Sequence, residues 1–356
     1  MSLALAAALA LAAAPPALID DDPEIVETVL VNKKGMRLRL INLGAIVSGI
    51  DMPDARGGYT NVVLGYGRES EYRANPNGFG ATIGRYAGRI ANARFTLGDQ
   101  AVSLVPNLGS NALHGGAIPG FDKRLFAIQA IGSTATFDMT SPDGDQGFPG
   151  ALTLTVTYTL GEDDSVRIDY RATTTKPTVL NLTNHSYFNL AGHGTVEDHH
   201  MRIAADRWVE ADDAGIPTGH YAPVAGTPLD FRDLHPIGDR IDKVMPGKPK
   251  GYNQAWLLAE RPRPAPALAV SLRDPDSGRS LDVYTTEPSV QVYSGDYFTG
   301  RDRDAQGRPL PPRSGIALET QHLADSPNRP AFPITTLRPG ETYTSTTIWR
   351  FGTAGR

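Results

Sequence analysis

The residues best suited to chemistry gather in one stretch, Val179–Leu190. If this stretch is an extended strand, residues two apart point to the same side, so Leu180 and Leu182 face a core. The opposite side then carries polar groups, namely Asn181, Thr183, His185 and Tyr187. Such a side can line a cleft for a polar ligand, or it can be the solvent-facing side of an antiparallel sheet.

Four other positions, far apart in the chain, carry groups that can bind a ligand or transfer protons. They are Arg89, His114, Gln291 and Glu319. His114 directly precedes Gly115-Gly116, where backbone can approach a ligand closely. Gln291 alternates with Val290 and Val292 and so faces away from their apolar side. Taken singly, each position also admits a plainer interpretation, as a solvated charge, a turn or the outer face of a strand.

Several kinds of site are excluded or disfavoured by the composition and motifs. The chain has 0 cysteines, so disulfides, thiolate metal sites and cysteine nucleophiles are ruled out. The glycines around Arg85 lack the strand-turn-helix context of a phosphate loop, and no Gly-x-Ser-x-Gly elbow is present. His193, His199 and His200 do not follow a standard ligand spacing, so no metal is predicted.

The net charge of -5, with no run of Lys or Arg, argues against a nucleic-acid surface. From Ile25 onward the dominant hydrophobic period is two, which indicates strands. The pattern is clearest in Leu152–Leu160 and Val166–Ala172, which Gly161–Asp164 joins into a predicted hairpin. No composition shift or repeat divides the chain, so residues 21–356 are expected to form a single all-β sandwich domain.

Residues 1–20 differ in kind from the rest. An Ala/Leu run, Leu3–Ala14, precedes Pro15-Pro16 and is too short to span a bilayer, which needs ~20 apolar residues. It matches the apolar core of a secretory signal, although the basic residues that usually precede such a core are missing. We expect a signal-like or disordered segment and a periplasmic or secreted protein. The alternatives are an Ala-rich helix packed on the domain and a cytoplasmic location.

Taken together, the motifs resemble the aldose 1-epimerase (galactose mutarotase) family. The matching pieces follow the family's order from about Ile25 to the end: Asn61–Gly65, Gly84–Ile90, Leu113–Gly116 with Gly120–Lys123, Asn181–Leu190, Val290–Gly295 and Leu318–Pro333. The most specific are Thr183–Leu190 and Leu318–Gln321. The resemblance implies a large antiparallel β-supersandwich with few short helices, which binds a free sugar in an open cleft without a metal or organic cofactor.

The resemblance also assigns roles. His185 matches the family's catalytic acid and Glu319 its catalytic base, while Arg89, His114 and Gln291 match residues that hold sugar hydroxyls. A carboxylate and an imidazolium suit anomer interconversion, because one group must take the proton of the C1 hydroxyl while another protonates the ring oxygen. Trp208 and Phe298 are candidate stacking platforms for the sugar, although core packing is the favoured interpretation of both.

Two departures from the family pattern bear on the substrate. Asn253 stands where the family usually has an aspartate that contacts the sugar, and Gly88 stands where it usually has an asparagine. The resemblance therefore predicts a metal- and cofactor-free isomerase of free aldohexoses of the galactose or glucose type. Two alternatives remain open, a non-catalytic sugar-binding protein and a hexose-phosphate epimerase. The expected partner is a small sugar, with no nucleic acid or membrane partner, and the protein is expected to be a monomer or homodimer.

Overall fold

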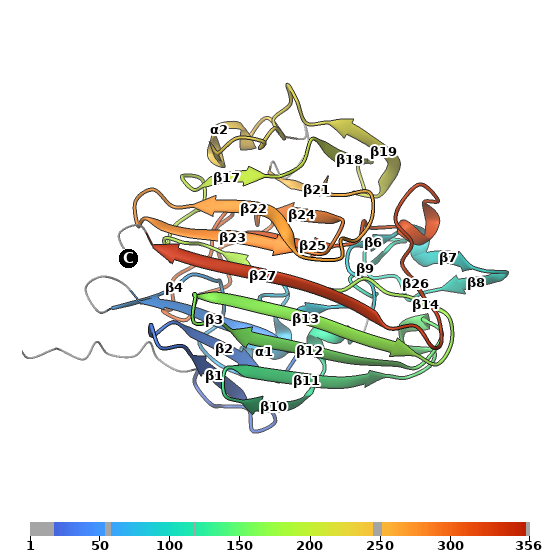
Figure 1. Cartoon of the computed structure of the whole chain (residues 1–356), viewed down its shortest axis with the longest axis horizontal. Helices are drawn as coiled ribbons and strands as arrows, with labels where there is room; N and C mark the ends of the chain where they lie inside the picture. Colours follow the sequence, from blue (N-terminus) through green and yellow to red (C-terminus); the bar gives the residue numbers. More distant parts are fainter. Residues whose placement is uncertain (1–17, 54–57, 117–118, 245–250, 354–356) are drawn as a thin grey trace, which may run out of the picture.

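Antiparallel strands are the main secondary structure of the chain in the computed structural model, which describes residues 18–53, 58–116, 119–244 and 251–353 (Figure 1). A 9-stranded sheet forms one layer. Its strands, in spatial order, are β10 (Ala127–Ile131), β11 (Thr134–Ser141), β12 (Leu152–Leu160), β13 (Ser165–Thr174), β27 (Tyr343–Thr353), β23 (Arg279–Thr285), β22 (Ala267–Arg273), β17 (His200–Ile203) and β20 (His235–Pro236).

Two smaller sheets pack their apolar sides toward the large one. The 6-stranded sheet contains, in order, β16 (Tyr187–Phe188), β25 (Ile316–Gln321), β24 (Ser289–Tyr293), β21 (Asn253–Leu257), β18 (Arg207–Ala211) and β19 (Pro217–Pro223). The 4-stranded sheet contains β1 (Glu27–Val31), β2 (Arg37–Ile41), β3 (Ile46–Pro53) and β4 (Tyr59–Asn61).

The remaining elements are short. Paired strands are β5 (Thr82–Ile83) with β15 (Thr183–Asn184), β6 (Arg89–Ile90) with β9 (Ala112–Leu113), β7 (Arg94–Leu97) with β8 (Gln100–Ser103), and β14 (Thr178–Val179) with β26 (Thr336–Leu337). The helices are α1 (Glu71–Ala74), α2 (Gly238–Ile241) and the single 3₁₀ turns η1 (Ala91–Ala93), η2 (Phe121–Lys123), η3 (Asp145–Gly147) and η4 (Ser326–Asn328). None of the helices in the described ranges is both long and apolar enough to cross a bilayer.

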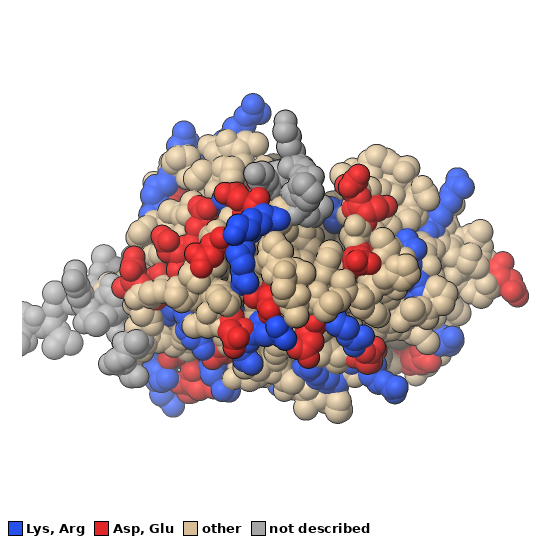
Figure 2. All heavy atoms as spheres, turned by 90° about the horizontal axis from the view of Figure 1, so that it is seen from above, with Lys and Arg blue, Asp and Glu red and all other residues tan. Residues whose placement is uncertain are grey.

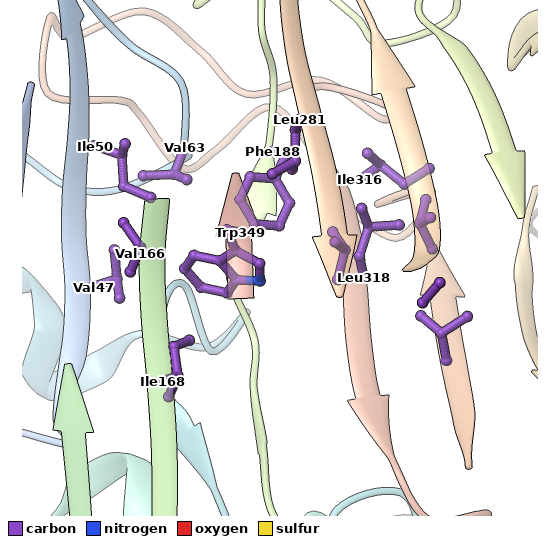
Figure 3. Close-up of a cluster of buried hydrophobic side chains, with 14 of the residues drawn as sticks. Val47, Ile50, Val63, Val166, Ile168, Phe188, Leu281, Ile316, Leu318 and Trp349 are labelled. Atoms are coloured by element: carbon purple, nitrogen blue, oxygen red, sulfur yellow. The ribbon is translucent and has the colours of Figure 1, made fainter. Parts of the chain in front are cut away.

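The main core lies between the layers and is made by the apolar positions of the alternating strands. Figure 3 shows Trp349 of β27 against Phe188 of β16, with ring centroids 5.0 Å apart. Side chains of β13 and β3 lie on one side of this pair, and those of β25 lie on the other. Stacking the sheets buries all of these side chains, so the sandwich predicted from the period-two pattern is confirmed.

The predicted hairpin is also confirmed. β12 and β13 pair from Leu152 with Thr174 to Leu160 with Val166. In the turn, the Gly161 amide donates to the Ser165 carbonyl at 2.7 Å, and Asp164 takes a left-handed φ of 62°. Asn32, from the turn before β2, donates its side-chain amide to the Gly161 carbonyl at 3.0 Å. This hydrogen bond therefore joins the turn before β2 to the turn between β12 and β13.

The prediction of one continuous strand at Val179–Leu190 is wrong. The stretch is divided among β14, β15 and β16, which belong to different sheets, and every residue from Val179 to Leu190 is buried. Alternation therefore does not separate a core side from a solvent side here, because neighbouring chain covers both sides.

Of the predicted N-terminal segment, residues 1–17 lie outside the described residues. Leu18 is buried, and Ile19 forms a bridge with Arg68. Asp22 pairs with Arg73 of α1 at 2.7 Å. Residues 18–22 thus pack on the domain. On the face seen in Figure 2, basic and acidic side chains are interspersed.

Replacing Trp349 with alanine should lower the free energy of unfolding by about 3–5 kcal/mol, because the ring is 1% exposed and its loss leaves a cavity between the sheets. Urea denaturation measures this change. Ile131 on the edge strand β10 is 71% exposed, so Ile131→Ala is the control and should change stability by less than about 0.5 kcal/mol. Similar losses in the two variants would contradict the placement of Trp349 in the core.

Candidate active site

His185 and Glu319 meet at the junction of β16 and β25. Tyr187 of β16 pairs with Ala317 of β25, and continuing that antiparallel register places His185 opposite Glu319. Their side chains confirm the placement, since His185 Nε2 lies 3.5 Å from Glu319 Oε1. Both residues are nearly inaccessible, at 5% and 3% exposure. A carboxylate and an imidazole are thus in contact in a mostly dry setting.

The backbone around His185 is held on both sides. Its amide donates to the Ala81 carbonyl at 2.9 Å, and its carbonyl accepts from Gly80 at 3.1 Å. The neighbouring Asn184 donates to the Gly80 carbonyl and to the Tyr158 hydroxyl. The imidazole stacks near Tyr187, with ring centroids 4.9 Å apart. These contacts fix the direction in which the ring points.

Burial raises the pKa of Glu319 above its ordinary value, while the positive charges of His185 and Arg89 oppose the rise. The net direction is upward. A carboxylate with a raised pKa is a stronger base than a solvated one, which favours general base catalysis.

His114 lies beside this pair and is held in one tautomer. The Gly88 amide donates to His114 Nδ1 at 3.2 Å, so Nδ1 is an acceptor and the ring proton sits on Nε2. The backbone of His114, in a left-handed conformation with φ 53°, donates in return to the Gly88 carbonyl. Burial, with the nearby charges of His185 and Arg89, holds the pKa of His114 well below its ordinary value. His114 is therefore a neutral donor.

A Cβ at Gly115 would lie 2.6 Å from the Gly84 carbonyl oxygen, and Gly115 has a φ of 95°. Only glycine fits this close approach. The His-Gly-Gly motif thus lets the loop of β9 pack against the segment before β6.

The group His114, His185 and Glu319 has the composition of a metal site, since one ligand atom of each lies within 4.8 Å of the others. The tautomer of His114 argues against that use. A metal ligand needs a free lone pair on Nε2, and Nε2 carries the proton because Nδ1 accepts from Gly88. The donor set fits hydrogen bonding to a polar ligand better than metal coordination.

Arg89 reaches the same place from β6. The Asp325 amide donates to the Arg89 carbonyl at 2.8 Å, and the Asp325 carboxylate accepts from the Ala91 amide at 3.0 Å. The loop after β25 therefore holds the strand that carries Arg89. A Cβ at Gly215 would lie 3.0 Å from the Arg89 Cζ, so the β18–β19 loop covers the guanidinium. Burial lowers the pKa of Arg89, and Glu319 opposes that shift.

Three neighbouring strands complete the polar surface. Gln291 of β24 pairs across from Glu319, and Gln291 Nε2 donates to Asn253 Oδ1 of β21 at 2.8 Å. Val290 and Val292 point the other way into the core, as the alternation predicted. The accepting Oδ1 of Asn253 is taken by Gln291, which leaves the Asn253 amide hydrogens for other acceptors.

The structure brings together all of the residues assigned by resemblance. For Phe298 and Trp208 it agrees with core packing, the interpretation favoured from the sequence. Phe298 is a core residue, 4% exposed, and Trp208 packs against the main core. The aromatic ring that sequence reasoning missed is Tyr297, which is the one exposed aromatic side chain in the described ranges, at 62%. Its hydroxyl interacts electrostatically with Arg89. The sequence around Tyr297 shows no period-two pattern that would have indicated an outward-facing ring.

Of the residues predicted to share a side with His185, Tyr187 does lie beside it, with ring centroids 4.9 Å apart, whereas Asn181 and Thr183 are packed in the interior. Asn181 is completely buried and its side chain bonds to the carbonyls of Ala87 and His322, so it does not line an open cleft. Thr183 is also buried, in β15 paired with β5. His199 accepts a hydrogen bond from the Leu190 amide at 2.9 Å, which gives it a structural role.

Comparison with known proteins decides the family. A family model described as aldose 1-epimerase matches residues 27–350. The chain belongs to the aldose 1-epimerase family. The mouse protein named galactose mutarotase is 40% identical over 92% of this chain and 95% of its own length. An Escherichia coli aldose 1-epimerase is 39% identical over 94% of this chain and 98% of its own length.

Solved structures agree with the fold of this epimerase. The aldose epimerase homologue of Caenorhabditis elegans superposes with a TM-score of 0.84 at 28% identity, covering 92% of this chain and 99% of that one. Galactose 1-epimerase from Lactobacillus acidophilus gives a TM-score of 0.79, also at 28% identity, covering 92% of this chain and 95% of that one. The galactose mutarotase-like sandwich expected from the sequence is thus confirmed.

Replacing Arg89 with glutamine should move the acidic limb of the kcat/KM profile to higher pH. Glu319 must be ionised to act as a base, so activity falls as the pH drops through its pKa. Removing the cation that opposes the upward shift raises this pKa further. Polarimetry across a pH series, corrected for buffer-catalysed mutarotation, measures the pH at which kcat/KM falls on the acidic side.

The control is Arg207→Gln, which removes a surface cation paired with Glu260 and should leave the limb in place. A limb that is unchanged or moves to lower pH in Arg89→Gln would contradict the assigned coupling between Arg89 and Glu319.

Proposed function

We propose that this protein interconverts the α and β anomers of free aldohexoses of the galactose or glucose type, with Glu319 as base and His185 as acid. The observation that carries the proposal is the buried contact between His185 Nε2 and Glu319 Oε1 at 3.5 Å. Family membership supports the reaction class, and neutral donors and amides around the pair support a polar, uncharged substrate.

In the ring-opening step, the ionised carboxylate of Glu319 takes the proton of the C1 hydroxyl. The electrons of the O–H bond form the carbonyl, the bond from C1 to the ring oxygen breaks, and protonated His185 delivers its proton to that oxygen. Both oxygens are attached to C1, so an acid and a base in contact can reach them together. The product is the open-chain aldehyde, with a protonated Glu319 and a neutral His185.

Rotation about the C1–C2 bond then presents the other face of the aldehyde. Reclosure uses the same two groups in their exchanged states, His185 taking the hydroxyl proton and Glu319 returning a proton to the carbonyl oxygen. Each cycle restores both groups, so no cofactor or external proton source is required. The chemistry is reversible, as anomer interconversion demands.

The surrounding groups hold the sugar while its first carbon rotates. The guanidinium of Arg89 and the Nε2–H of His114 donate to hydroxyl oxygens. Gln291 and Asn253 add amide donors and acceptors, since they are bonded to each other at 2.8 Å and each keeps further capacity. Tyr297 offers an exposed ring that can cover an apolar face of the sugar.

An epimerase of phosphorylated hexoses is disfavoured by the position of Arg85. This residue is completely buried, and its guanidinium donates to the carbonyls of Pro149 and Gly150 at 3.0 and 2.8 Å. It is therefore committed to backbone and is not available to bind a phosphate. An unphosphorylated sugar fits these groups better.

Glu319→Gln and His185→Asn should each lower kcat by ~10²–10⁴-fold, because each removes one proton-transfer group while keeping a polar side chain of similar shape. Polarimetry on freshly dissolved α-D-galactose and α-D-glucose measures the rate above buffer. His235→Asn is the control, since His235 lies in β20 at the far edge of the large sheet and should leave kcat unchanged. Wild-type rates equal to buffer across several aldoses would refute the proposed activity.

Asn253 motivates the second candidate, a sugar-binding protein without useful catalysis. An aspartate at 253 would still accept from Gln291, and its charge would strengthen a hydrogen bond to a sugar hydroxyl by about 1 kcal/mol. We therefore expect Asn253→Asp to lower KM by roughly fivefold with kcat within about threefold. The matched control is Asn42→Asp, a buried asparagine away from the site. A gain of a hundredfold or more in kcat would instead favour the binding protein for the wild type.

For the cellular location, we propose export to the periplasm or outside the cell, on the basis of the Ala/Leu run Leu3–Ala14 and the three alanines that end it, directly before Pro15-Pro16. Fractionation of bacteria expressing the full chain, with N-terminal sequencing of the recovered protein, tests this. Recovery from the cytoplasm with an intact N-terminus would oppose it. The sugar is proposed as the partner of a monomer or homodimer.

A further inference from the structure

Asn181 is a completely buried residue whose polar groups all bond to backbone. Its side-chain Nδ2 donates to the carbonyls of Ala87 and His322, at 2.9 and 3.0 Å. Its Oδ1 accepts from the His322 amide at 2.9 Å. Its own amide donates to the Arg85 carbonyl, and its carbonyl accepts from the Ala87 amide at 2.8 Å. One side chain thus joins three chain segments.

Each of the three segments carries a residue of the site. Ala87 lies two residues before Arg89, and His322 lies three residues after Glu319. Asn181 itself lies four residues before His185. The acid, the base and the arginine come from distant parts of the sequence, and the Asn181 side chain bonds the segment that leads to Arg89 to the segment that follows Glu319.

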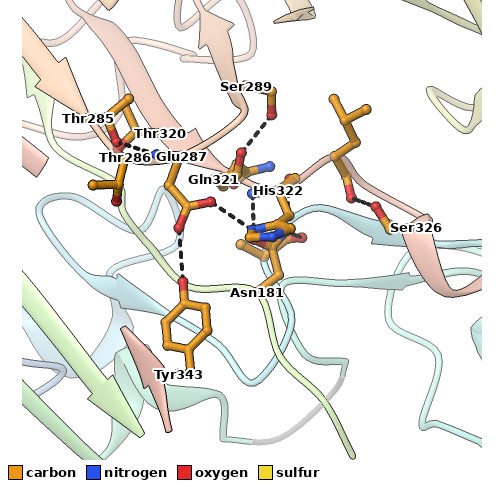
Figure 4. Close-up of polar contacts among 12 residues, drawn as sticks. Asn181, Thr285, Thr286, Glu287, Ser289, Thr320, Gln321, His322, Ser326 and Tyr343 are labelled. Carbon is orange, nitrogen blue, oxygen red and sulfur yellow. Dashed lines mark hydrogen bonds and ion pairs between the residues drawn. The ribbon is translucent and has the colours of Figure 1, made fainter. Parts of the chain in front are cut away.

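The His322 end of this connection is anchored in turn. His322 Nδ1 lies 2.7 Å from Glu287 Oε2, and the Tyr343 hydroxyl donates to Glu287 Oε1 at 3.1 Å (Figure 4). The Ser289 hydroxyl donates to the Gln321 carbonyl at 2.6 Å. Glu287 and Ser289 mark the start of β24, which carries Gln291. The end of β25 is therefore tied both to Asn181 and to the neighbouring strand.

We propose that Asn181, braced by the His322–Glu287 pair, is a positioning residue that sets the approach of Glu319 to His185. It touches neither the sugar nor the reacting atoms. It acts through the backbone of β25 and of the segment leading to His185. This role rests on the proposed function of His185 and Glu319, and it goes beyond the assignment of those two residues.

The chemistry of the side chain explains why an asparagine is required. The Asn181 site needs two donors facing carbonyl oxygens and one acceptor facing an amide, and a primary amide supplies this set at the right reach. An aspartate would place an oxygen 2.9 to 3.0 Å from the carbonyls of Ala87 and His322, where no hydrogen is available. Alanine would leave all three backbone groups without their partner.

The test compares Asn181→Asp and Asn181→Ala with the same changes at Asn42. Asn42 is a matched control because it is also buried and also bridges backbone, accepting from the Val26 amide at 2.8 Å and donating to the Glu24 carbonyl at 3.1 Å. Polarimetry gives kcat and KM for galactose, thermal melting gives stability, and calorimetric titration with galactose gives the fraction of protein that binds. If Asn181→Asp does not fold, Asn181→Ala and the milder Glu287→Gln provide the comparison.

We expect both Asn181 variants to lose about 10- to 100-fold in kcat per binding-competent molecule, since small misplacements of reacting groups cost this much. KM should stay within about threefold, and the Asn42 variants should lose comparable stability without losing kcat. A crystal structure of Asn181→Ala should show a changed separation between His185 Nε2 and Glu319 Oε1.

The inference is overturned if kcat per binding-competent molecule is unchanged in the Asn181 variants, or if the Asn42 variants lose as much. It is also overturned if the separation in the Asn181→Ala crystal equals that of the wild type. These outcomes are distinct from failure of the proposed function, which would appear as a wild-type rate equal to buffer. The crystallographic comparison decides the positioning role even in that case.

Discussion

The contact between Glu319 and His185 is the interaction on which the site depends, because it places an ionisable carboxylate in a nearly dry part of a sheet. Burial of a charge is unfavourable unless partners compensate for it. His185 and Arg89 supply that compensation without removing the raised pKa of Glu319. The same balance makes the carboxylate a useful base. More positive charge nearby would lower the pKa of Glu319 and make it a weaker base. Less positive charge would raise the pKa further and favour the protonated form, which cannot accept a proton.

The fold meets this requirement with backbone as much as with side chains. The register between β16 and β25 places the acid opposite the base, and the register between β24 and β25 places Gln291 on the other side. Gly88, which departs from the family pattern, contributes through its amide by fixing the tautomer of His114. A Cβ at position 88 would lie 2.9 Å from the Ala324 side chain, so glycine also permits close packing there.

Period-two alternation was sufficient to predict the sandwich and the hairpin at Leu152–Leu160, because those strands have one buried and one exposed side. It failed at Val179–Leu190, where three short strands are covered on both sides and the pattern carries no orientation. The pairing of His185 with Glu319 came from family resemblance, since register between distant segments has no local signal. Alternation placed Asn181 beside His185 but could not give its backbone contacts, and it gave no signal for Tyr297. Those contacts depend on three backbone segments meeting, and the exposure of Tyr297 depends on a loop that turns its ring outward.

The central claim is that Glu319 and His185 act together on the two oxygens of C1. A crystal structure with bound galactose tests this most directly. We expect the C1 hydroxyl within about 3 Å of a Glu319 carboxylate oxygen and the ring oxygen within about 3 Å of His185 Nε2, the reach of a hydrogen bond. A sugar bound with C1 turned away from this pair, toward Tyr297 or solvent, would contradict it.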